Sequence, residues 1–399
     1  MLDLQSPFFN SKIALTRLEQ EQILKIETIN QDITSNLSID KKIRHQVLSR
    51  KKIQKKLPSI YNCNEIIFPV SLSLEQSSSE ITANYKASLL KGKTFIDLTT
   101  GMGIDSLFIA KQFEQGILIE RNQELAEIDL HNFFVLNQTN VKIAVGIDSI
   151  DFINEFNEKV DLIYIDPARR NEQGNKVVSL TEYEPNVVSI LDKLFTLSSN
   201  ILIKTSPLLD ISKAIAELKF VKEVHVISVD NECKELVFQL EKEYENEIKI
   251  TTINFDKKGK QIFDYYLKDE KQTISEYAEP LYYLYEPNAS IMKAGAFKII
   301  GQQLGLKKLH PHTHLYTSEN LIENFPGRTF KIDAITKFDK KEIARMIPEM
   351  QANIAVRNFP ISTNEVRKKL GIKDGGDLYL FVTTNFKNEK IIIINKKAE

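Results

Sequence analysis

The chain has 399 residues, 42% of them hydrophobic and 27% charged, which is the composition of a soluble globular protein. This length exceeds what one ordinary hydrophobic core requires, so we expect two to four domains. No apolar run approaches the roughly 20 residues that span a bilayer, the N-terminus lacks the pattern of a signal peptide, and two cysteines, Cys63 and Cys233, are too few for a disulfide scaffold or a four-cysteine zinc site. We therefore expect a cytoplasmic protein without a membrane segment.

The net charge of −1 conceals an uneven distribution. Residues 251–399 contain 24 of the 53 basic and 18 of the 54 acidic residues, which gives +6 there and −7 in the preceding part. Two stretches contain no acid: one has eight Lys and Arg between Lys41 and Lys56, the other has four lysines between Pro287 and Ser318. Such patches can neutralise phosphates, although a basic helix face is also often merely solvated.

Residues 1 to about 75 are predicted to be helical, with Pro58 and Pro69 as breaks. The apolar residues that recur there at helical spacing are Leu15, Leu18, Ile26, Ile29 and Ile33. A further helix is predicted over residues 71–90.

From Lys93 onward, short apolar strands alternate with helical stretches. The predicted strands are 94–98, 116–120, 141–145, 161–165 and 200–204. This alternation indicates a parallel sheet with helices on both faces. The next two strands, 224–229 and 235–240, are separated by a segment that allows a hairpin but is too short for a helical crossover. We therefore predict an α/β fold with a Rossmann-like seven-stranded sheet of the methyltransferase type.

After residue 241 the pattern changes to small α+β modules. A strand is predicted at 248–255, helices at 340–350 and 362–370, and strands at 378–383 and 390–394.

The first strand-to-helix turn is the strongest local signal for a ligand site. Asp97 ends the strand, and Thr99, Gly101 and Gly103 follow it. The two glycines allow a tight turn and a close approach of the backbone to a ligand. Ser106 stands where a pyrophosphate-binding fingerprint has its third glycine, which disfavours NAD and FAD. Asp97 suits a ligand with a cationic amino-acid end, such as S-adenosyl-L-methionine.

Two further acids are predicted at the same edge of the sheet. Glu120 closes the second strand and suits the ribose hydroxyls of an adenosyl group. Asp148, just after the third strand, suits the adenine amino group, and Ser149 beside it is assigned to the same site. Each acid alone could be a strand-end or helix-capping residue. Three in register predict a cofactor site, because ligands bind at the carboxyl ends of such strands.

The fourth strand ends in Asp166-Pro167-Ala-Arg169-Arg170. Asp-Pro at this place resembles the Asp/Asn-Pro-Pro-aromatic motif of methyltransferases that modify base nitrogens, in which oxygen atoms accept hydrogen bonds from the target nitrogen. The stacking aromatic is replaced by two arginines, which can stack on a base or bind phosphate. Alternatively, they pair with acids and only support the loop.

Lys204, at the end of the fifth strand, completes the predicted catalytic group. It could bind phosphate or the target base, or it could be a solvated strand-end lysine. No cysteine lies near Asp166 or Lys204 in the sequence, which disfavours a mechanism with a cysteine nucleophile.

Five motifs carry a resemblance to a known family. They are Leu-Glu-Gln-Ser-Ser-Ser-Glu-x-Thr-Ala-x-Tyr-Lys-Ala (74–87), Asp-Pro-Ala-Arg-Arg (166–170), Glu-Pro-Asn-Ala-Ser-Ile-Met-Lys-Ala-Gly (286–295), Phe-Pro-Gly-Arg (325–328) and Ala-Val-Arg-Asn-Phe-Pro (355–360). By these motifs the chain resembles a bacterial family of class I S-adenosylmethionine-dependent methyltransferases with a THUMP-like C-terminal domain. Ser77 is a departure, because a cysteine is expected there in relatives.

The resemblance implies four parts: an N-terminal helical region (1–84), a methyltransferase domain (85–246), a ferredoxin-like module (247–320) and a THUMP-like domain (321–399). Because THUMP domains bind RNA, it also implies methylation of RNA, tRNA or rRNA, at a base nitrogen. The basic residues that support this partner are Arg357, Arg367, Lys368, Lys369 and Lys373. No obligate protein partner is inferred.

Three alternatives remain open: a methyltransferase for a small molecule or protein, a non-catalytic RNA-binding factor, and a nicotinamide-dependent oxidoreductase. His310, His312 and His314 could place metal ligands on one face of a strand. Since no Cys, Asp or Glu accompanies them in the sequence, we predict no metal site there.

Overall fold

The computed structural model describes residues 3–29, 39–70, 74, 77–169 and 179–398. The chain divides into two compact units, Met1–Lys222 with Leu236–Glu245, and Glu223–Glu235 with Asn246–Glu399. Among the described residues, no helix is both long and apolar enough to cross a membrane.

The predicted seven-stranded sheet is present. Its strands are β2 (Gly92–Asp97), β3 (Phe113–Glu120), β4 (Val141–Val145), β5 (Leu162–Ile165), β8 (Asn200–Thr205), β9 (Val221–Val229) and β10 (Glu232–Glu241). Their order is β4-β3-β2-β5-β8-β10-β9. The first five are parallel, and β10 is antiparallel to β8, as the short β9–β10 connection predicts.

Three strands that were not assigned to this sheet extend it to ten. They are β1 (Leu4–Gln5), which pairs antiparallel with β4, and β11 (Lys249–Asp256) with β12 (Gly259–Tyr266), which follow β9 in the strand order. The expectation that the first 75 residues are helical is therefore wrong for β1, whose two residues are too few to show an alternating pattern.

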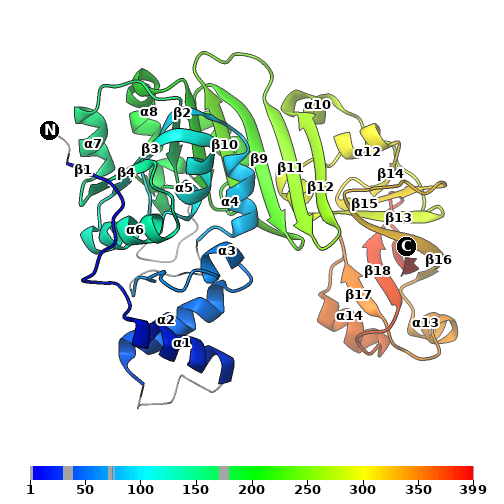
Figure 1. Ribbon diagram of the computed structural model, residues 1–399. Coiled ribbons are helices and arrows are strands. Elements are labelled where there is room, and N and C mark those ends of the chain that lie inside the picture. The colour runs from blue at the N-terminus through cyan, green and yellow to red at the C-terminus, as the bar shows by residue number, and fades with distance from the viewer. Residues whose placement is uncertain (1–2, 30–38, 71–73, 75–76, 170–178, 399) are drawn as a thin grey trace. The chain divides into compact units, whose positions relative to one another are not determined.

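Helices connect the parallel strands and flank the sheet (Figure 1). They are α5 (Ile104–Ile109), α6 (Gln123–Val135), α7 (Ser149–Glu155), α8 (Val187–Leu197) and α9 (Ile211–Glu217), with short 3-10 turns at Ala110–Gln112 and Leu180–Glu182. Side-chain caps fix where several of them begin: Asn122 accepts from the Leu125 amide, and Asp148 from the Ile150 amide. The carboxyl edge of the sheet is thus lined by strand ends and helix starts.

The N-terminal helices α1 (Arg17–Ile29), α2 (Lys41–Ile53) and α3 (Pro58–Tyr61) pack beside α6. Their shared core contains Leu15, Ile23, Ile43, Val47, Ile67 and, from α6, Ile128. The predicted apolar face is wrong at Leu18, which lies in the first turn of α1 and is 78% exposed. Ile33 lies outside the described residues.

The helix predicted over residues 71–90 is shorter than expected. It is α4 (Glu80–Ala87), and it begins there because the Ser79 hydroxyl caps it by accepting from the Thr82 amide at 3.3 Å. Ser77 and Ser78 are not helical, which leaves the Ser78 side chain available for contacts with the sheet.

The basic stretch from Lys41 to Lys56 is partly structural. Arg50 is buried, pairs with Glu27 at 3.1 Å, and donates to the carbonyls of Tyr61 and Cys63. Lys56 donates to the Leu74 carbonyl. This stretch therefore offers fewer groups to phosphate than the sequence indicates.

In the second unit, one seven-stranded sheet has the order β14-β15-β13-β16-β19-β18-β17. The strands are β13 (Tyr283–Pro287), β14 (Lys307–His310), β15 (Thr313–Ser318), β16 (Gly327–Lys337), β17 (Asn353–Val356), β18 (Leu378–Thr384) and β19 (Lys390–Lys397). The helices of this unit are α10 (Leu267–Gln272), α11 (Ala289–Ala294), α12 (Ile299–Leu304), α13 (Lys340–Met346) and α14 (Thr363–Leu370). The two small modules expected from the sequence therefore share a sheet, through the β13–β16 pair.

Two apolar clusters stabilise this unit. One contains Ile343 of α13, Val366 of α14 and Leu380 of β18; the other contains Leu284 and Phe330. Helix α13 ends at Met346, earlier than the predicted 350, because Pro348 cannot continue it.

Candidate active site

The turn after β2 has the backbone conformation that its glycines predict. Gly101 and Gly103 have φ of +60° and +64°, and Gly103 precedes the first residue of α5. A Cβ atom at Gly103 would lie 2.5 Å from the Phe133 ring of α6, so no larger residue fits there. A Cβ at Gly101 would meet only the Thr99 carbonyl, at 4.0 Å, so this backbone is open to a ligand.

Asp97 stabilises this turn through hydrogen bonds. Its side chain is buried, and it accepts hydrogen bonds from the Thr99 amide at 2.9 Å and from the Ser106 hydroxyl. Burial raises the pKa of Asp97 to about 7. Ser106, at the position of the missing third glycine, therefore holds the strand-end acid in place.

Glu120 links the turn to β3. Its carboxylate accepts from the amides of Gly101 at 2.9 Å and Asn122 at 2.7 Å, and burial raises its pKa. A carboxylate has about four acceptor positions, so two remain for ribose hydroxyls.

Asp148 caps α7 and is half-buried, and Ser149, the first residue of that helix, is buried. Because β2, β3 and β4 are neighbours and parallel, Asp97, Glu120 and Asp148 follow three adjacent strands at one edge. Three acids beside an open glycine turn fit an adenosyl ligand with a cationic amino-acid end.

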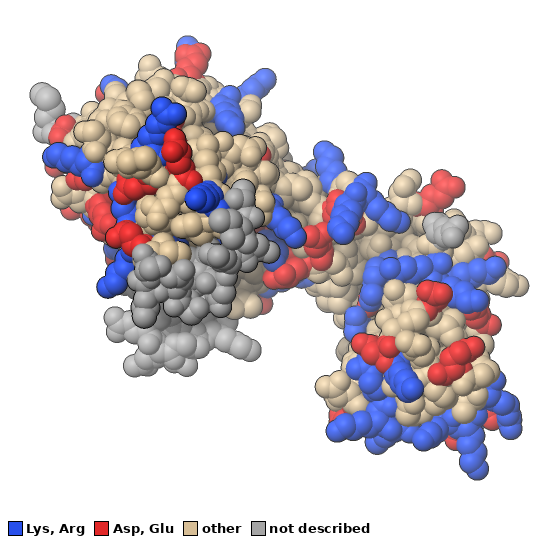
Figure 2. All heavy atoms as spheres, turned by 60° about the horizontal axis from the view of Figure 1, so that its bottom comes forward, with Lys and Arg blue, Asp and Glu red and all other residues tan. Residues whose placement is uncertain are grey.

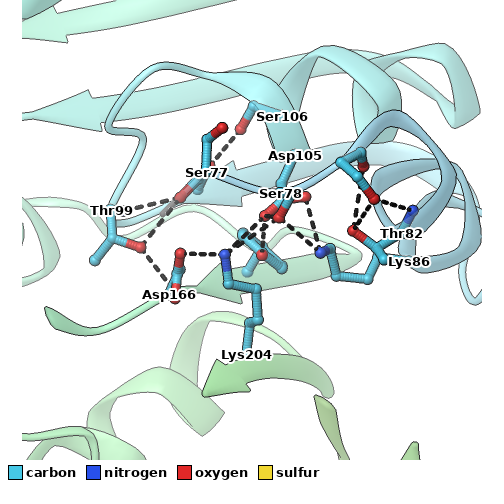
Figure 3. Close-up of polar contacts among 12 residues, drawn as sticks. Ser77, Ser78, Thr82, Lys86, Thr99, Asp105, Ser106, Asp166 and Lys204 are labelled. Atoms are coloured by element: carbon cyan, nitrogen blue, oxygen red, sulfur yellow. Dashed lines mark hydrogen bonds and ion pairs between the residues drawn. The ribbon is translucent and has the colours of Figure 1, made fainter. Parts of the chain in front are cut away.

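Asp166 and Lys204 meet at the ends of β5 and β8 (Figure 3). The Lys204 ammonium lies 2.5 Å from Oδ2 of Asp166, and the Asp166 amide donates to the Thr99 hydroxyl at 2.6 Å. Desolvation raises the pKa of Asp166, and Lys204 opposes that shift. The Asp166 side chain is 37% exposed, so it can still accept a hydrogen bond from a ligand.

A buried network behind this pair was not predicted from the sequence (Figure 3). Asp105 of α5 lies at its centre and contacts Lys86 at 3.0 Å and Lys204 at 3.4 Å. It also accepts from the hydroxyls of Ser78 at 2.9 Å and Tyr164 at 2.6 Å. Although burial acts in the opposite direction, the two lysines hold the pKa of Asp105 well below its usual value.

The sequence contained a signal for this network. Lys86 and Asp105 are charges beside buried apolar residues of their helices, Ala83 and Ala87 for Lys86 and Leu107 for Asp105. A charge at a core position needs a buried partner. The sequence does not indicate which partner, and Ser78 lies 126 residues from Lys204.

The remaining predicted catalytic residues lie around the Asp166 turn. Pro167 is buried, whereas Arg169 is exposed in β6 (Ala168–Arg169), opposite Tyr183 of β7 (Tyr183–Glu184). Arg170 lies outside the described residues. Tyr183 is itself buried, and this burial raises the pKa of its hydroxyl.

Asp129 of α6 is a second group that the sequence did not indicate. It is completely buried, and within the described parts of the chain neither carboxyl oxygen has a hydrogen-bond partner. Burial, with smaller contributions from Glu120 and Asp97, raises its pKa well above the usual value. Burial therefore favours the protonated form of Asp129, which lies behind the glycine turn.

The three histidines do not share a strand. His310 ends β14, His312 lies in the turn, and His314 is on β15 with its ring stacked on Phe297 at 3.7 Å. Burial lowers the pKa of His314 to about 4. No group of metal-binding side chains occurs in the described residues.

Several basic residues assigned to RNA binding are on the surface. Figure 2 shows many Lys and Arg side chains on one face of the second unit, with fewer acids among them. Lys368, Lys369 and Lys373 are exposed, whereas Arg367 pairs with Asp374 at 2.5 Å.

Two family models match the C-terminal part: a ferredoxin-like domain at residues 283–326 and a THUMP domain-like model at residues 327–397. The sequence has no significant match among curated proteins.

Solved structures similar to this chain include a "putative methyltransferase from Porphyromonas gingivalis W83", which is 32% identical and has a TM-score of 0.84 over 96% of this chain and 100% of that one. TrmK of M. capricolum, in complex with S-adenosyl-homocysteine, is 14% identical, with a TM-score of 0.32 over 43% of this chain and 70% of its own. An rRNA methylase from Streptococcus thermophilus is 13% identical, with a TM-score of 0.31 over 41% of this chain and 96% of its own. From the first of these matches and the two C-terminal domains, we conclude that the chain belongs to the family of the P. gingivalis protein, in which a methyltransferase-like α/β domain precedes ferredoxin-like and THUMP-like domains.

Proposed function

We propose that this protein transfers a methyl group from S-adenosyl-L-methionine to a base nitrogen of RNA, in tRNA or rRNA. The observation that carries the proposal is the Asp166–Lys204 pair, joined through Thr99 to the glycine turn after Asp97. Hydrogen bonds thus connect Asp166, the residue proposed to bind the target base, to the glycine turn proposed to bind the cofactor.

The cofactor residues have separate tasks. Asp97 faces the cationic amino-acid end, Gly101 and Gly103 provide close backbone approach, Glu120 accepts from the ribose, and Asp148 with Ser149 lies at the adenine. When bound, the cofactor supplies a methyl group already activated on sulfur. The protein then mainly has to orient the acceptor.

Asp166 orients that acceptor. Its carboxylate accepts a hydrogen bond from an N–H of the target base, which directs the nitrogen lone pair toward the methyl group. Lys204 favours the ionised carboxylate, and Asp105 with Lys86 fixes Lys204. Arg169, exposed after Pro167, contacts the nucleotide. The sequence assigns the same role to Arg170, which lies outside the described residues.

RNA is preferred as the substrate for two reasons. The THUMP-like match covers residues 327–397, and residues 251–399 carry the +6 charge. Excess positive charge favours a polyanion.

The test is methyl transfer by Asp166→Ala to RNA from cells that lack the gene. The acceptor contact is lost while the cofactor residues are untouched, so we expect transfer to fall by at least about 100-fold. Affinity for S-adenosylhomocysteine, measured by calorimetry, should change by less than about threefold. Mass spectrometry of nucleosides from wild-type and deletion cells identifies the methylated base.

Asp192→Ala is the matched control, since Asp192 is an exposed acid in a surface pair with Lys219. It should leave both quantities unchanged. Loss of cofactor affinity in Asp166→Ala would show that Asp166 belongs to the cofactor site. Transfer to protein or small molecules, with none to RNA, would refute the RNA assignment.

A further inference from the structure

Three of the five family motifs meet around one carboxylate in the second unit. Glu286 on β13 lies opposite Arg328 on β16, and Arg357 directly follows β17. The catalytic proposal uses none of these residues.

Glu286 is bound by both guanidinium groups. Its side chain is only 8% exposed. Oε2 accepts from Nε of Arg328 at 2.7 Å and also from its Nη2, while Oε1 accepts from Nε at 2.8 Å and Nη2 at 2.6 Å of Arg357. Each arginine thus presents the same edge to one carboxylate, which fixes both planes.

The backbone conformation allows β13 and β16 to lie close together at this cluster. A Cβ atom at Gly327 would lie 2.2 Å from the Glu286 carbonyl oxygen, so only glycine allows β16 to lie this close to β13. The segment after Arg357 is also fixed, because Asn358 bonds to His310 at 3.0 Å and to Thr313 at 3.1 Å. Glu286 and the two arginines therefore lie on three segments, β13, β16 and the segment after β17, whose positions are fixed by other contacts.

The charges in this cluster do not balance. Two guanidinium groups share one carboxylate, and among the described residues neither pairs with another acid, so the cluster keeps one positive charge. The other arginines of this unit that form ion pairs have one acid each: Arg345 with Glu342 and Arg367 with Asp374. A purely structural ion pair with Glu286 would be neutral with only one arginine.

The surplus charge faces solvent. Arg328 and Arg357 are 39% and 43% exposed, and Nη1 of Arg357 donates to the Val356 carbonyl at 2.8 Å. Two adjacent, fixed guanidinium groups match the geometry of a phosphodiester, whose oxygens accept bidentate hydrogen bonds. We propose that Arg328 and Arg357 form a binding site for a phosphodiester of the RNA backbone, with Glu286 as the residue that positions them. This proposal rests on the RNA function above and names the contact by which the second unit holds its substrate.

The experiment measures binding of tRNA to the full chain by fluorescence anisotropy over a salt series. Arg357→Gln and Arg328→Gln should each weaken binding about tenfold and reduce the salt slope by about one. Arg357→Lys should keep the slope and lose only part of the affinity, because charge is retained but the planar fork is not. Arg345→Gln, an exposed arginine of the same unit, should change affinity by less than about twofold.

A second measurement uses the unaltered protein, in case a variant does not fold. Phenylglyoxal modifies exposed arginines, and RNA should protect Arg328 and Arg357 while Arg345 still reacts. Equal modification with and without RNA would overturn the site, as would wild-type affinity and slope in both Gln variants. If the wild-type protein binds tRNA, those results contradict the arginine site but not the RNA function. A wild-type protein that binds neither tRNA nor rRNA would contradict both proposals.

Discussion

Asp97 is the group through which pH should control cofactor affinity. Its carboxyl is buried at the end of β2 with a pKa of about 7, so it is largely protonated at pH 6 and largely ionised at pH 8. A ligand with a cationic amino-acid end favours the ionised form. Affinity should therefore increase as the pH rises through 7.

The size of this effect follows from the pKa. If the ligand binds only the ionised form, its dissociation constant is proportional to the inverse of the ionised fraction. That fraction increases about tenfold between pH 6 and pH 8 for a pKa of about 7, equivalent to about 1.4 kcal/mol.

The assay is calorimetry with S-adenosylhomocysteine from pH 5.5 to pH 8.5. Methylthioadenosine, which lacks the amino-acid end, is the control ligand and should show little dependence on pH, even though burial also raises the pKa of Glu120 near the ribose position. Asp97→Asn should bind more weakly, with a flat profile. A tenfold pH dependence that persists in Asp97→Asn, or that methylthioadenosine shares, would refute the assignment.

Two stability predictions concern the buried charges. Lys86→Met breaks the fully buried contact with Asp105 and should lower the free energy of unfolding by about 3–5 kcal/mol in urea titrations; Lys219→Met, at an exposed pair, should lower it by at most about 1 kcal/mol. Asp129→Asn should raise the melting temperature at pH 8. The raised pKa means that the folded protein retains this proton to a higher pH than the unfolded chain, in which the carboxyl ionises above about pH 3.8. The stability of the wild-type protein should therefore fall as the pH rises above about 3.8.

The outcomes that contradict these predictions are distinct. Equal losses in Lys86→Met and Lys219→Met would mean that the buried network does not stabilise the fold. For Asp129→Asn, the gain should nearly vanish at about pH 3, where the carboxyl is largely protonated in both the folded and the unfolded state. A gain that is the same at about pH 3 and at pH 8 would exclude ionisation as its cause.

Much of the first unit could be predicted because its signals are local. Each parallel strand is a short apolar run with an acid at or just after its end, so Asp97, Glu120 and Asp148 could be assigned to the ends of three consecutive strands. The structure adds that these three strands are neighbours in the sheet. The glycine turn was equally local, since positive φ at Gly101 and Gly103 depends on those residues alone.

Local sequence patterns indicated the strands of the seven-stranded sheet, the glycine turn and the family motifs, whereas the order of the strands comes from the tertiary structure. Tertiary structure decided which buried charges meet: Lys86, Asp105 and Lys204 come from three elements, and Glu286 and Arg357 lie 71 residues apart. It also decided that the two small modules share a sheet. The physical reason is that a repeating apolar pattern records which face of an element is buried, whereas the partner of a buried charge depends on which distant element packs against it.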